Sequence, residues 1–183
     1  MTDPTETTDT AGPTNRVDES DLEWTEYDEG DARFSRKRLA GAAGGDRLGA
    51  SLYELPSGER AWPYHYHTGN EEAMYVLDGE GTVALGPDAT AYDLVPGTYV
   101  ALPRGEESAH EVRAAGAGGD RTGTGEDPLR FLVFSTMNDP DVTVYPNRGS
   151  VGLFAGSAPG GDGSARRLSR YLDLDAEVDY WEE

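Results

Sequence analysis

Residues 58–79 read GERAWPYHYHTGNEEAMYVLDG and contain two of the three histidines of this 183-residue chain. His65 and His67 stand two residues apart in a segment typical of a β-strand, in which alternate side chains point to the same face. Both imidazoles should therefore project toward one spot. Glu72 begins the next apolar run and shares a face with Met74. An unpaired carboxylate is costly to bury there, and a cation or a hydrogen-bond donor beside it would offset that cost.

The third histidine, His110, comes about forty residues later, on another predicted strand that follows a turn at residues 103–105. A His-x-His pair alone is a weak signal, because such pairs on strands are most often surface residues or satisfied core residues. The full set is more specific, since it holds every histidine of the protein and an adjoining glutamate. It suggests one site that contains His65, His67, Glu72 and His110.

From about residue 33 onward the chain has the pattern of an all-β domain. Short apolar or alternating runs follow one another, separated by Gly, Pro, Asn and Asp. No amphipathic helix intervenes, and evenly spaced short strands favour an antiparallel sandwich or barrel. The strands are expected near residues 34–39, 48–54, 61–67, 72–78, 81–86, 90–94, 98–102, 109–114, 129–136, 141–145 and 151–154.

Outside these strands, composition predicts tails and loops. Residues 1–30 are almost all polar or acidic and should form a largely disordered tail, because they cannot bury enough surface to offset their ordering entropy. The barrel is expected over residues 31–157, and a C-terminal extension over 158–183 should pack on it. Gly-rich loops are expected at 115–128 and 156–166. The extension should include a short helix or strand before Tyr180 and Trp181.

Two stretches of the chain resemble the two sequence motifs of the cupin superfamily. The first is the 58–79 stretch quoted above, and the second runs from Gly97 through the turn at 103–105 to His110. The resemblance covers about residues 33–155, and the flanks are similar to those of a group of uncharacterised single-domain cupins. It implies a double-stranded β-helix, which is a jelly-roll barrel, with one divalent transition-metal ion inside. The resemblance assigns this ion to His65, His67, Glu72 and His110.

The chain departs from the cupin pattern in three places. The spacing from Gly58 to His65 is one residue longer than in the motif, and the spacing from Gly105 to His110 is two residues longer. Ala114 stands where an asparagine is expected, which removes a supporting polar group rather than a metal ligand. The longer loop before His110 would shift that residue relative to the other three.

Three imidazoles and one carboxylate suit Mn, Fe, Co, Ni or Zn, and suit Ca or Mg poorly. On a six-coordinate ion two positions stay open for water, substrate or dioxygen, whereas a tetrahedral zinc would be closed and structural. Two functions therefore remain. One is a metalloenzyme acting on a small organic molecule, such as a dioxygenase, an isomerase or a sugar-modifying enzyme. The other is a non-enzymatic metal or small-ligand binding module, and a storage or structural role without metal is a third alternative.

The sequence names no separate catalytic group and no organic cofactor. There is no cysteine and no further histidine, and Glu71, the nearest extra carboxylate, is expected to face solvent. Alternation along the predicted strands indicates which side chains face the cavity. Two tyrosines would face it instead if the inward and outward positions were exchanged. The predicted wall is Met74, Val76, Ala101, Phe131 and Val133, and the two tyrosines are Tyr75 and Tyr99.

The aromatic residues Trp62, Tyr64 and Tyr66 alternate with the histidines and should share the outer face of the same strand. Three aromatic side chains on an outer sheet face need cover. An N-terminal strand or the C-terminal tail of the same chain would provide it, and so would a subunit interface. The cupin resemblance suggests a homodimer.

The formal net charge is −20, from 35 acidic residues against 15 basic ones, of which only Lys37 is a lysine. Such a chain would be repelled by nucleic acids and by anionic membranes. A carboxylate-rich surface with little lysine suggests a salt-adapted organism. The first ten residues, MTDPTETTDT, do not resemble a secretory signal, no apolar run is long enough to span a bilayer, and a chain without cysteine forms no disulfide. A cytoplasmic location is therefore expected.

Overall fold

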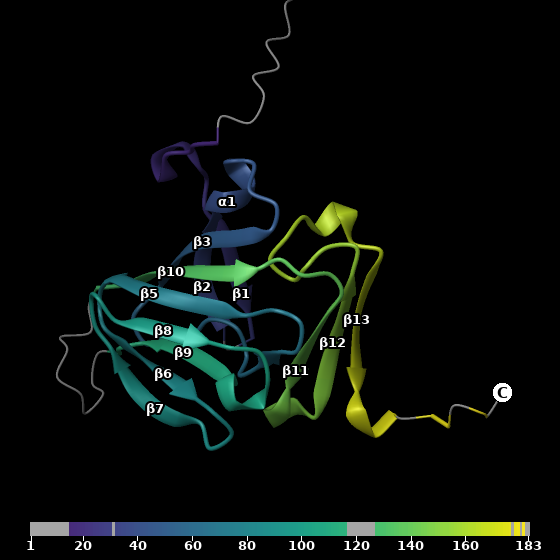
Figure 1. Cartoon of the computed structure of the whole chain (residues 1–183). Helices are drawn as coiled ribbons and strands as arrows, with labels where there is room; N and C mark the ends of the chain where they lie inside the picture. Colours follow the sequence, from purple (N-terminus) through teal and green to yellow (C-terminus); the bar gives the residue numbers. More distant parts are fainter. Residues whose placement is uncertain (1–14, 31, 117–126, 177, 180, 182–183) are drawn as a thin grey trace, which may run out of the picture.

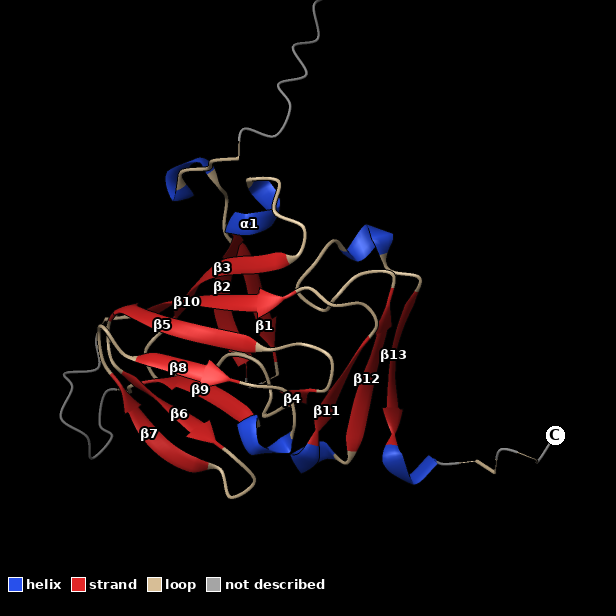
Figure 2. Ribbon diagram, in the orientation of Figure 1, coloured by secondary structure: helices blue, strands red, loops and turns tan. Residues whose placement is uncertain are grey.

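The computed structural model describes residues 15–30, 32–116, 127–176, 178–179 and 181. Its strands surround a common interior and are joined by loops and short helical turns (Figure 1 and Figure 2). The prediction of an all-β jelly-roll barrel is confirmed. Three predicted features lie outside the described residues: the first fourteen residues of the acidic tail, most of the 115–128 loop, and Tyr180.

The largest sheet has six strands in the order β1-β2-β3-β10-β5-β8. Every neighbouring pair is antiparallel, so residues directly opposite each other share a face of the sheet. The strands are β1 (Thr25–Glu29), β2 (Ala32–Arg38), β3 (Leu48–Leu55), β10 (Leu129–Thr136), β5 (Glu72–Asp78) and β8 (Tyr99–Leu102).

Two smaller sheets complete the barrel. One has the order β7-β6-β9, and the other has the order β13-β12-β11-β4. Their strands are β7 (Thr90–Leu94), β6 (Gly81–Leu85), β9 (His110–Ala114), β13 (Leu168–Asp173), β12 (Ser150–Ala155), β11 (Asp141–Tyr145) and β4 (Tyr66–His67).

Helical structure among the described residues is limited to short pieces. The one α-helix in this part of the chain is α1 (Leu39–Ala42), which connects β2 to β3. No helix in the described part of the chain is long and apolar enough to span a bilayer. The 3₁₀ turns are η1 (Glu19–Asp21), η2 (Glu106–Ser108), η3 (Pro146–Arg148), η4 (Gly163–Ala165) and η5 (Leu174–Ala176).

The interior of the barrel is filled from two of the sheets. The largest sheet contributes side chains that are almost completely buried, namely Phe34, Leu55, Met74, Phe131 and Leu129. The β7-β6-β9 sheet contributes Val83, Leu94 and Val112. At about 25 cal/mol per Å² of apolar surface removed from water, each large apolar side chain stabilises the fold by roughly 1.5–3 kcal/mol.

The prediction of which side chains face the interior is correct for most of the cavity wall and wrong for Ala101. Met74, Val76 and Phe131 are buried, and Val133 packs against them, whereas Ala101 points to solvent. Ala101 pairs with Ala73, on the opposite face of the sheet from Glu72 and Met74. The register of β5 against β8 depends on the conformation of the intervening loops and turns, which hydrophobic alternation does not determine.

On β8 the inward residues are Val100 and Leu102. The alternative wall residues, Tyr75 and Tyr99, pair with each other and have exposed fractions of 40% and 63%. Their hydroxyl groups therefore belong to the outer face of the barrel and not to its cavity.

The strand predicted at residues 61–67 is much shorter in the structure. Only Tyr66 and His67 form a strand, and His65 makes an isolated bridge to His110. The aromatic row consequently does not share one outer face. Tyr64 is buried, and the Trp62 ring packs edge-on against Tyr27 and Phe34 at centroid distances of 5.0 and 4.6 Å. The N-terminal strand β1, one of the three expected sources of cover, thus covers part of Trp62 through Tyr27, and Trp62 remains 36% exposed.

One strand was not predicted, and another was expected only as a short helix or strand of the C-terminal extension. β1 lies inside the segment assigned to the acidic tail, and only Tyr27 of its five residues is partly buried. β13 lies in the C-terminal extension, and all of its residues are exposed. Both are edge strands held by backbone pairing with one neighbour, so they lack the apolar alternation by which strands are recognised in a sequence.

Candidate metal centre

The three histidines meet where the 61–67 segment crosses β9. The backbone of His65 and the backbone of His110 exchange two hydrogen bonds, of 3.1 and 2.8 Å. Their rings consequently lie side by side, with centroids 4.6 Å apart. His67 follows on β4, and its ring centroid is 5.2 Å from that of His65. Segments that are distant in the sequence thus bring three buried imidazoles together.

Each imidazole is oriented by a hydrogen bond from its Nδ1 nitrogen. The acceptors are the carbonyl of Pro63 for His65, at 2.7 Å, and the carbonyl of Ser108 for His110, at 3.0 Å. The acceptor for His67 is a carboxylate, described below. A nitrogen that faces an acceptor carries the proton, so in the neutral ring the Nε2 atom keeps its lone pair. The three rings are therefore held in the tautomer that binds metals through Nε2.

Glu72, the first residue of β5, faces the same three rings. Its Oε2 atom lies 3.5 Å from Nε2 of His110 and 3.6 Å from Nε2 of His67, and its side chain is 16% exposed. Potential ligand atoms of His65, Glu72 and His110 all lie within 4.8 Å of one another, and His67 adjoins this group through Glu72. The structure thus brings all four sequence-predicted residues together, with Glu71 exposed as expected.

Asp141 is a member of the site to which the sequence analysis gave no role. Its side chain is fully buried, and its Oδ2 atom accepts a 2.6 Å hydrogen bond from Nδ1 of His67. Its other oxygen accepts a 2.8 Å hydrogen bond from the backbone nitrogen of Gly69. A Cβ atom at Gly69 would lie only 2.9 Å from that oxygen, so the close approach requires glycine. No sequence signal marks Asp141 as this partner, because it is 74 residues from His67.

The loop between the His-x-His pair and Glu72 is fixed by Asn70. This side chain is almost completely buried, and its Nδ2 donates to the carbonyl of Asn138 at 3.2 Å. Its Oδ1 accepts from the backbone nitrogen of Asn138 at 2.7 Å and from Oγ1 of Thr136 at 3.1 Å. A buried amide satisfied on both sides holds its backbone rigidly. Asn70 therefore fixes Glu72 relative to His67.

The protonation equilibria of the three histidines differ. Burial lowers the pKa of His65 well below 6.5, and the neighbouring His110 and His67 lower it further. Burial also lowers the pKa of His110, against the opposing effect of the Glu72 charge. For His67, burial is outweighed by the hydrogen bond with Asp141 and by the charges of Glu72 and Asp141, so the pKa is raised. At neutral pH the rings of His65 and His110 are therefore neutral, and the ring of His67 is paired with a carboxylate.

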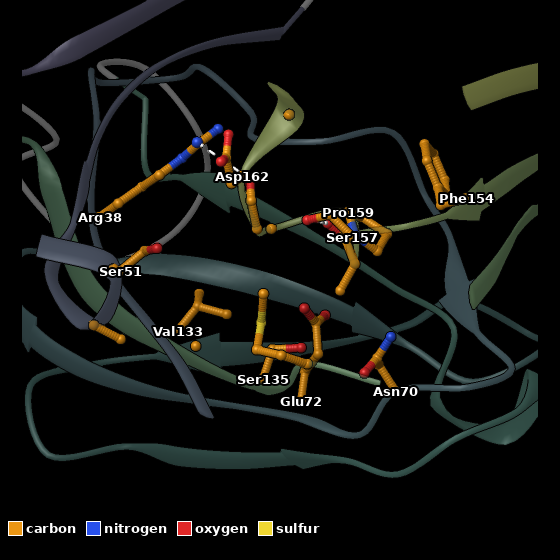
Figure 3. Close-up of a pocket in the computed structure, with 18 of the residues that line it drawn as sticks. Arg38, Ser51, Asn70, Glu72, Val133, Ser135, Phe154, Ser157, Pro159 and Asp162 are labelled. Carbon is orange, nitrogen blue, oxygen red and sulfur yellow. Dashed lines mark hydrogen bonds between the residues drawn. The ribbon is translucent and has the colours of Figure 1, made fainter. Parts of the chain in front are cut away.

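A cavity of about 1060 Å³ lies next to these residues and includes His65, His67 and Glu72 in its wall. Figure 3 shows Ser51, Val133 and Glu72 on the sheet side of the cavity, with Ser157 and Pro159 on the loop that faces them. A volume of this size is sufficient for a small polar ligand and its water. The site is therefore connected to a space in which a molecule could react.

The donor set fits a divalent transition-metal ion. Imidazole nitrogens and a carboxylate suit Mn, Fe, Co, Ni or Zn, whereas Ca and Mg prefer oxygen ligands alone. The His67–Asp141 pair matches the carboxylate–histidine arrangement that orients ligands at metal sites. The residues present thus agree with the chemistry that such an ion requires.

The centre of the chain is similar to a known family. Residues 51–134 match the family model described as Cupin domain. This match includes all four of the residues predicted for the site. Among curated proteins no match was found.

Solved structures extend the similarity beyond the matched region. A proposed sugar phosphate isomerase from Acidithiobacillus ferrooxidans superposes with a TM-score of 0.70 at 23% identity, covering 92% of this chain and 98% of that chain. A sugar phosphate isomerase of the cupin superfamily from Silicibacter pomeroyi gives 0.68 at 21% identity, covering 88% and 94%. A polyketide cyclase from Streptomyces resistomycificus gives 0.52 at 23% identity, covering 66% and 78%. These likenesses establish the fold, a cupin β-barrel.

Proposed function

We propose that the protein is a metal-dependent enzyme that binds one divalent transition-metal ion through His65, His67, Glu72 and His110. Its substrate would be a small polar organic molecule bound in the adjoining cavity. The observation that supports this most strongly is the convergence of three imidazoles, each with its Nδ1 tied to an acceptor, on a single carboxylate. On a six-coordinate ion, four protein ligands would leave two positions for water or substrate.

When bound, the ion would act as a Lewis acid that polarises a carbonyl or hydroxyl oxygen of the substrate. The residues of the chain have distinct tasks around it. Glu72 would offset part of the positive charge of the ion, and Asp141 holds His67 in the orientation in which its Nε2 faces Glu72. Tyr145 stacks on the His65 ring at a centroid distance of 5.9 Å and lines the cavity. Burial, followed by its contact with Tyr171, raises the pKa of Tyr145, so its hydroxyl stays protonated at neutral pH.

Isomerisation of a sugar phosphate is the reaction we propose to test first. Two structures that resemble this chain over nearly their whole length are described as sugar phosphate isomerases, one of them as a proposed one. The cavity wall also includes the aromatic residues Tyr53 and Trp62 beside the polar site, a combination suited to a chain of hydroxylated carbons. Dioxygenase and other sugar-modifying activities are the next classes to assay.

The first test compares Glu72→Gln with its neighbour Glu71→Gln. Both variants lose one carboxylate charge, but Glu71 is exposed and Glu72 faces the histidines. Bound metal per chain is measured by plasma mass spectrometry after loading with one equivalent of Mn²⁺, Fe²⁺, Co²⁺, Ni²⁺ or Zn²⁺. We expect Glu72→Gln to weaken binding by roughly tenfold or more and Glu71→Gln to leave it unchanged. Equal metal content in the two variants would contradict the proposed ligand set.

The second step is a turnover assay of the metal-loaded chain with aldose and ketose phosphates, with and without chelator. Chelator-sensitive turnover supports the enzyme. If the protein binds an ion that carries no exchangeable water, the alternative function is supported, namely a non-enzymatic metal or small-ligand binding module.

A further inference from the structure

Arg36 on β2 is a buried cation that faces the cavity. Its exposed fraction is 8%, and its guanidinium lies over the Tyr53 ring with Cζ 5.4 Å from the ring centroid. Its Nε and Nη2 atoms donate to Oγ of Ser51 at 3.0 and 2.9 Å, and Nη2 also approaches the carbonyl of Gly160 at 3.3 Å. Nη1 makes no hydrogen bond to any residue that the structure describes.

No carboxylate in the described part of the chain lies within ion-pair distance of Arg36. The other buried arginine of the described residues, Arg60, is 5% exposed and pairs with Glu111 at 3.0 Å. The buried Lys37, on the opposite face of β2, donates instead to the backbone carbonyl of Glu19 at 2.8 Å. A guanidinium stays charged at all physiological pH values, and burying it without a counter-charge is unfavourable. Arg36 is therefore a buried positive charge that no carboxylate of the described residues neutralises.

The sheet register connects Arg36 with the candidate metal centre. Arg36 lies opposite Tyr53 on β3, and its guanidinium reaches along the sheet to Ser51. Ser51 and Glu72 are on the same face, two strands and two residues apart. A strand spacing of about 4.8 Å and a rise of about 3.3 Å per residue place their backbones about 12 Å apart. Both residues line the same cavity, so one molecule with several carbons can contact both ends.

We propose that Arg36, with Ser51, binds the anionic group of the substrate, an oxyanion of the phosphate-monoester or carboxylate class. Nε and Nη2 of its planar fork already donate to Ser51 and Gly160, so the two N–H groups of Nη1 are the donors left for the oxygens of such a group. Arg36 and Glu72 line the same cavity. The anionic end of the substrate lies at Arg36, and the reacting end lies at the histidines. The assignment of the reacting end rests on the proposed function, whereas the anion site rests on Arg36 alone.

Isothermal titration calorimetry of the full chain tests this, with ribose 5-phosphate, gluconate and ribose as probes. Each probe is titrated into both metal-free and metal-loaded protein. We expect at least one of the two anionic probes to bind more tightly than neutral ribose, and the comparison of the two distinguishes a phosphate site from a carboxylate site. Arg36→Gln should lower the affinity for that anion roughly tenfold or more in both forms of the protein. Arg36→Lys keeps the positive charge and loses the planar fork, so it should lower the affinity for the anion less. This variant replaces Arg36→Gln in the test if the glutamine variant does not fold.

Arg33→Gln is the matched control. Arg33 is on the same strand, its side chain is on the outer face and 61% exposed, and the variant loses the same charge. Anion affinity in this variant should equal that of the wild type, and metal content should be equal in all variants. The inference is overturned if neither anion binds more tightly than ribose, or if Arg36→Gln binds anions as the wild type does. Arg36-dependent anion binding in a chain that retains no metal would instead uphold this inference and contradict the proposed function.

Discussion

At the scale of single residues, a hydrogen bond from Nδ1 fixes the orientation of each imidazole. Nδ1 of His65 donates to the carbonyl of Pro63, and Nδ1 of His67 donates to Asp141. The two rings lie close together, with centroids 5.2 Å apart, as alternation along a strand predicts. Neither Asp141 nor Arg36 could be identified from the sequence, because nothing in their own segments distinguishes a buried polar residue from an exposed one.

Asp141→Asn should weaken both the fold and metal binding. The substitution removes the charge that pairs with His67 in a fully buried contact, so we expect a loss of about 2–4 kcal/mol in the unfolding free energy of the metal-free protein. It should also lower metal affinity by about tenfold to a hundredfold, since His67 loses its orienting partner. Urea denaturation and metal titration measure the two effects. Asp88→Asn, at an exposed position, is the control.

The stability difference between this variant and the wild type should depend on pH in a defined way. The pKa of Asp141 is lowered from 3.8, because the His67 hydrogen bond outweighs burial, so its contribution is present above that value and lost as pH falls through the folded pKa. The pKa of His67 is raised from 6.5, so its contribution is lost as pH rises through the folded pKa. The difference should be largest between pH 3.8 and 6.5. A difference that grows steadily above neutral pH would contradict the pairing.

At the scale of elements, the positions of most strands could be predicted from the sequence. The side of each strand that faces the interior could be predicted only in part. Runs at 72–78, 90–94, 129–136 and 141–145 coincide with β5, β7, β10 and β11. The 61–67 segment shows the limit, because most of it passes between sheets without regular pairing. Its histidines still share a site, since one makes a bridge to β9 and the other pairs with β11.

The β7-β6-β9 sheet carries His110 and depends on Gly81. The ladder between β6 and β9 runs from the Gly81–Ala114 pair to the Leu85–His110 pair. A Cβ atom at position 81 would lie 2.4 Å from the carbonyl oxygen of Arg113. Gly81→Ala should therefore cost about 2 kcal/mol of unfolding free energy through overpacking.

Urea denaturation at constant metal content measures this loss. Gly163→Ala is the control, because nothing lies within 4 Å of its Cβ position and its φ is not positive. We expect the control to remain within about 0.5 kcal/mol of the wild type. If Gly81→Ala unfolded at the same urea concentration as the wild type, β6 and β9 would not approach each other this closely.

At the scale of the whole molecule, the barrel is what joins distant segments into one site. The sequence motifs predicted this convergence through their resemblance to cupins, and hydrophobic periodicity alone would have given only an antiparallel β domain. The homodimer stays a prediction. Its expected aromatic face is only partly covered within the chain, since Tyr64 is buried whereas Trp62, which packs on Tyr27 and Phe34, remains 36% exposed. The outer tyrosines of β5 and β8, Tyr75 and Tyr99, remain exposed.

The proposed metal centre requires that His65, His67 and His110 bind the same ion as Glu72. X-ray absorption fine structure of the full chain loaded with one equivalent of Co²⁺ measures this, because imidazole rings give characteristic multiple scattering. We expect three imidazole ligands per cobalt, reduced to two in His67→Ala, with oxygen ligands completing the shell. A shell of oxygen atoms alone, or a spectrum unchanged by His67→Ala, would contradict it.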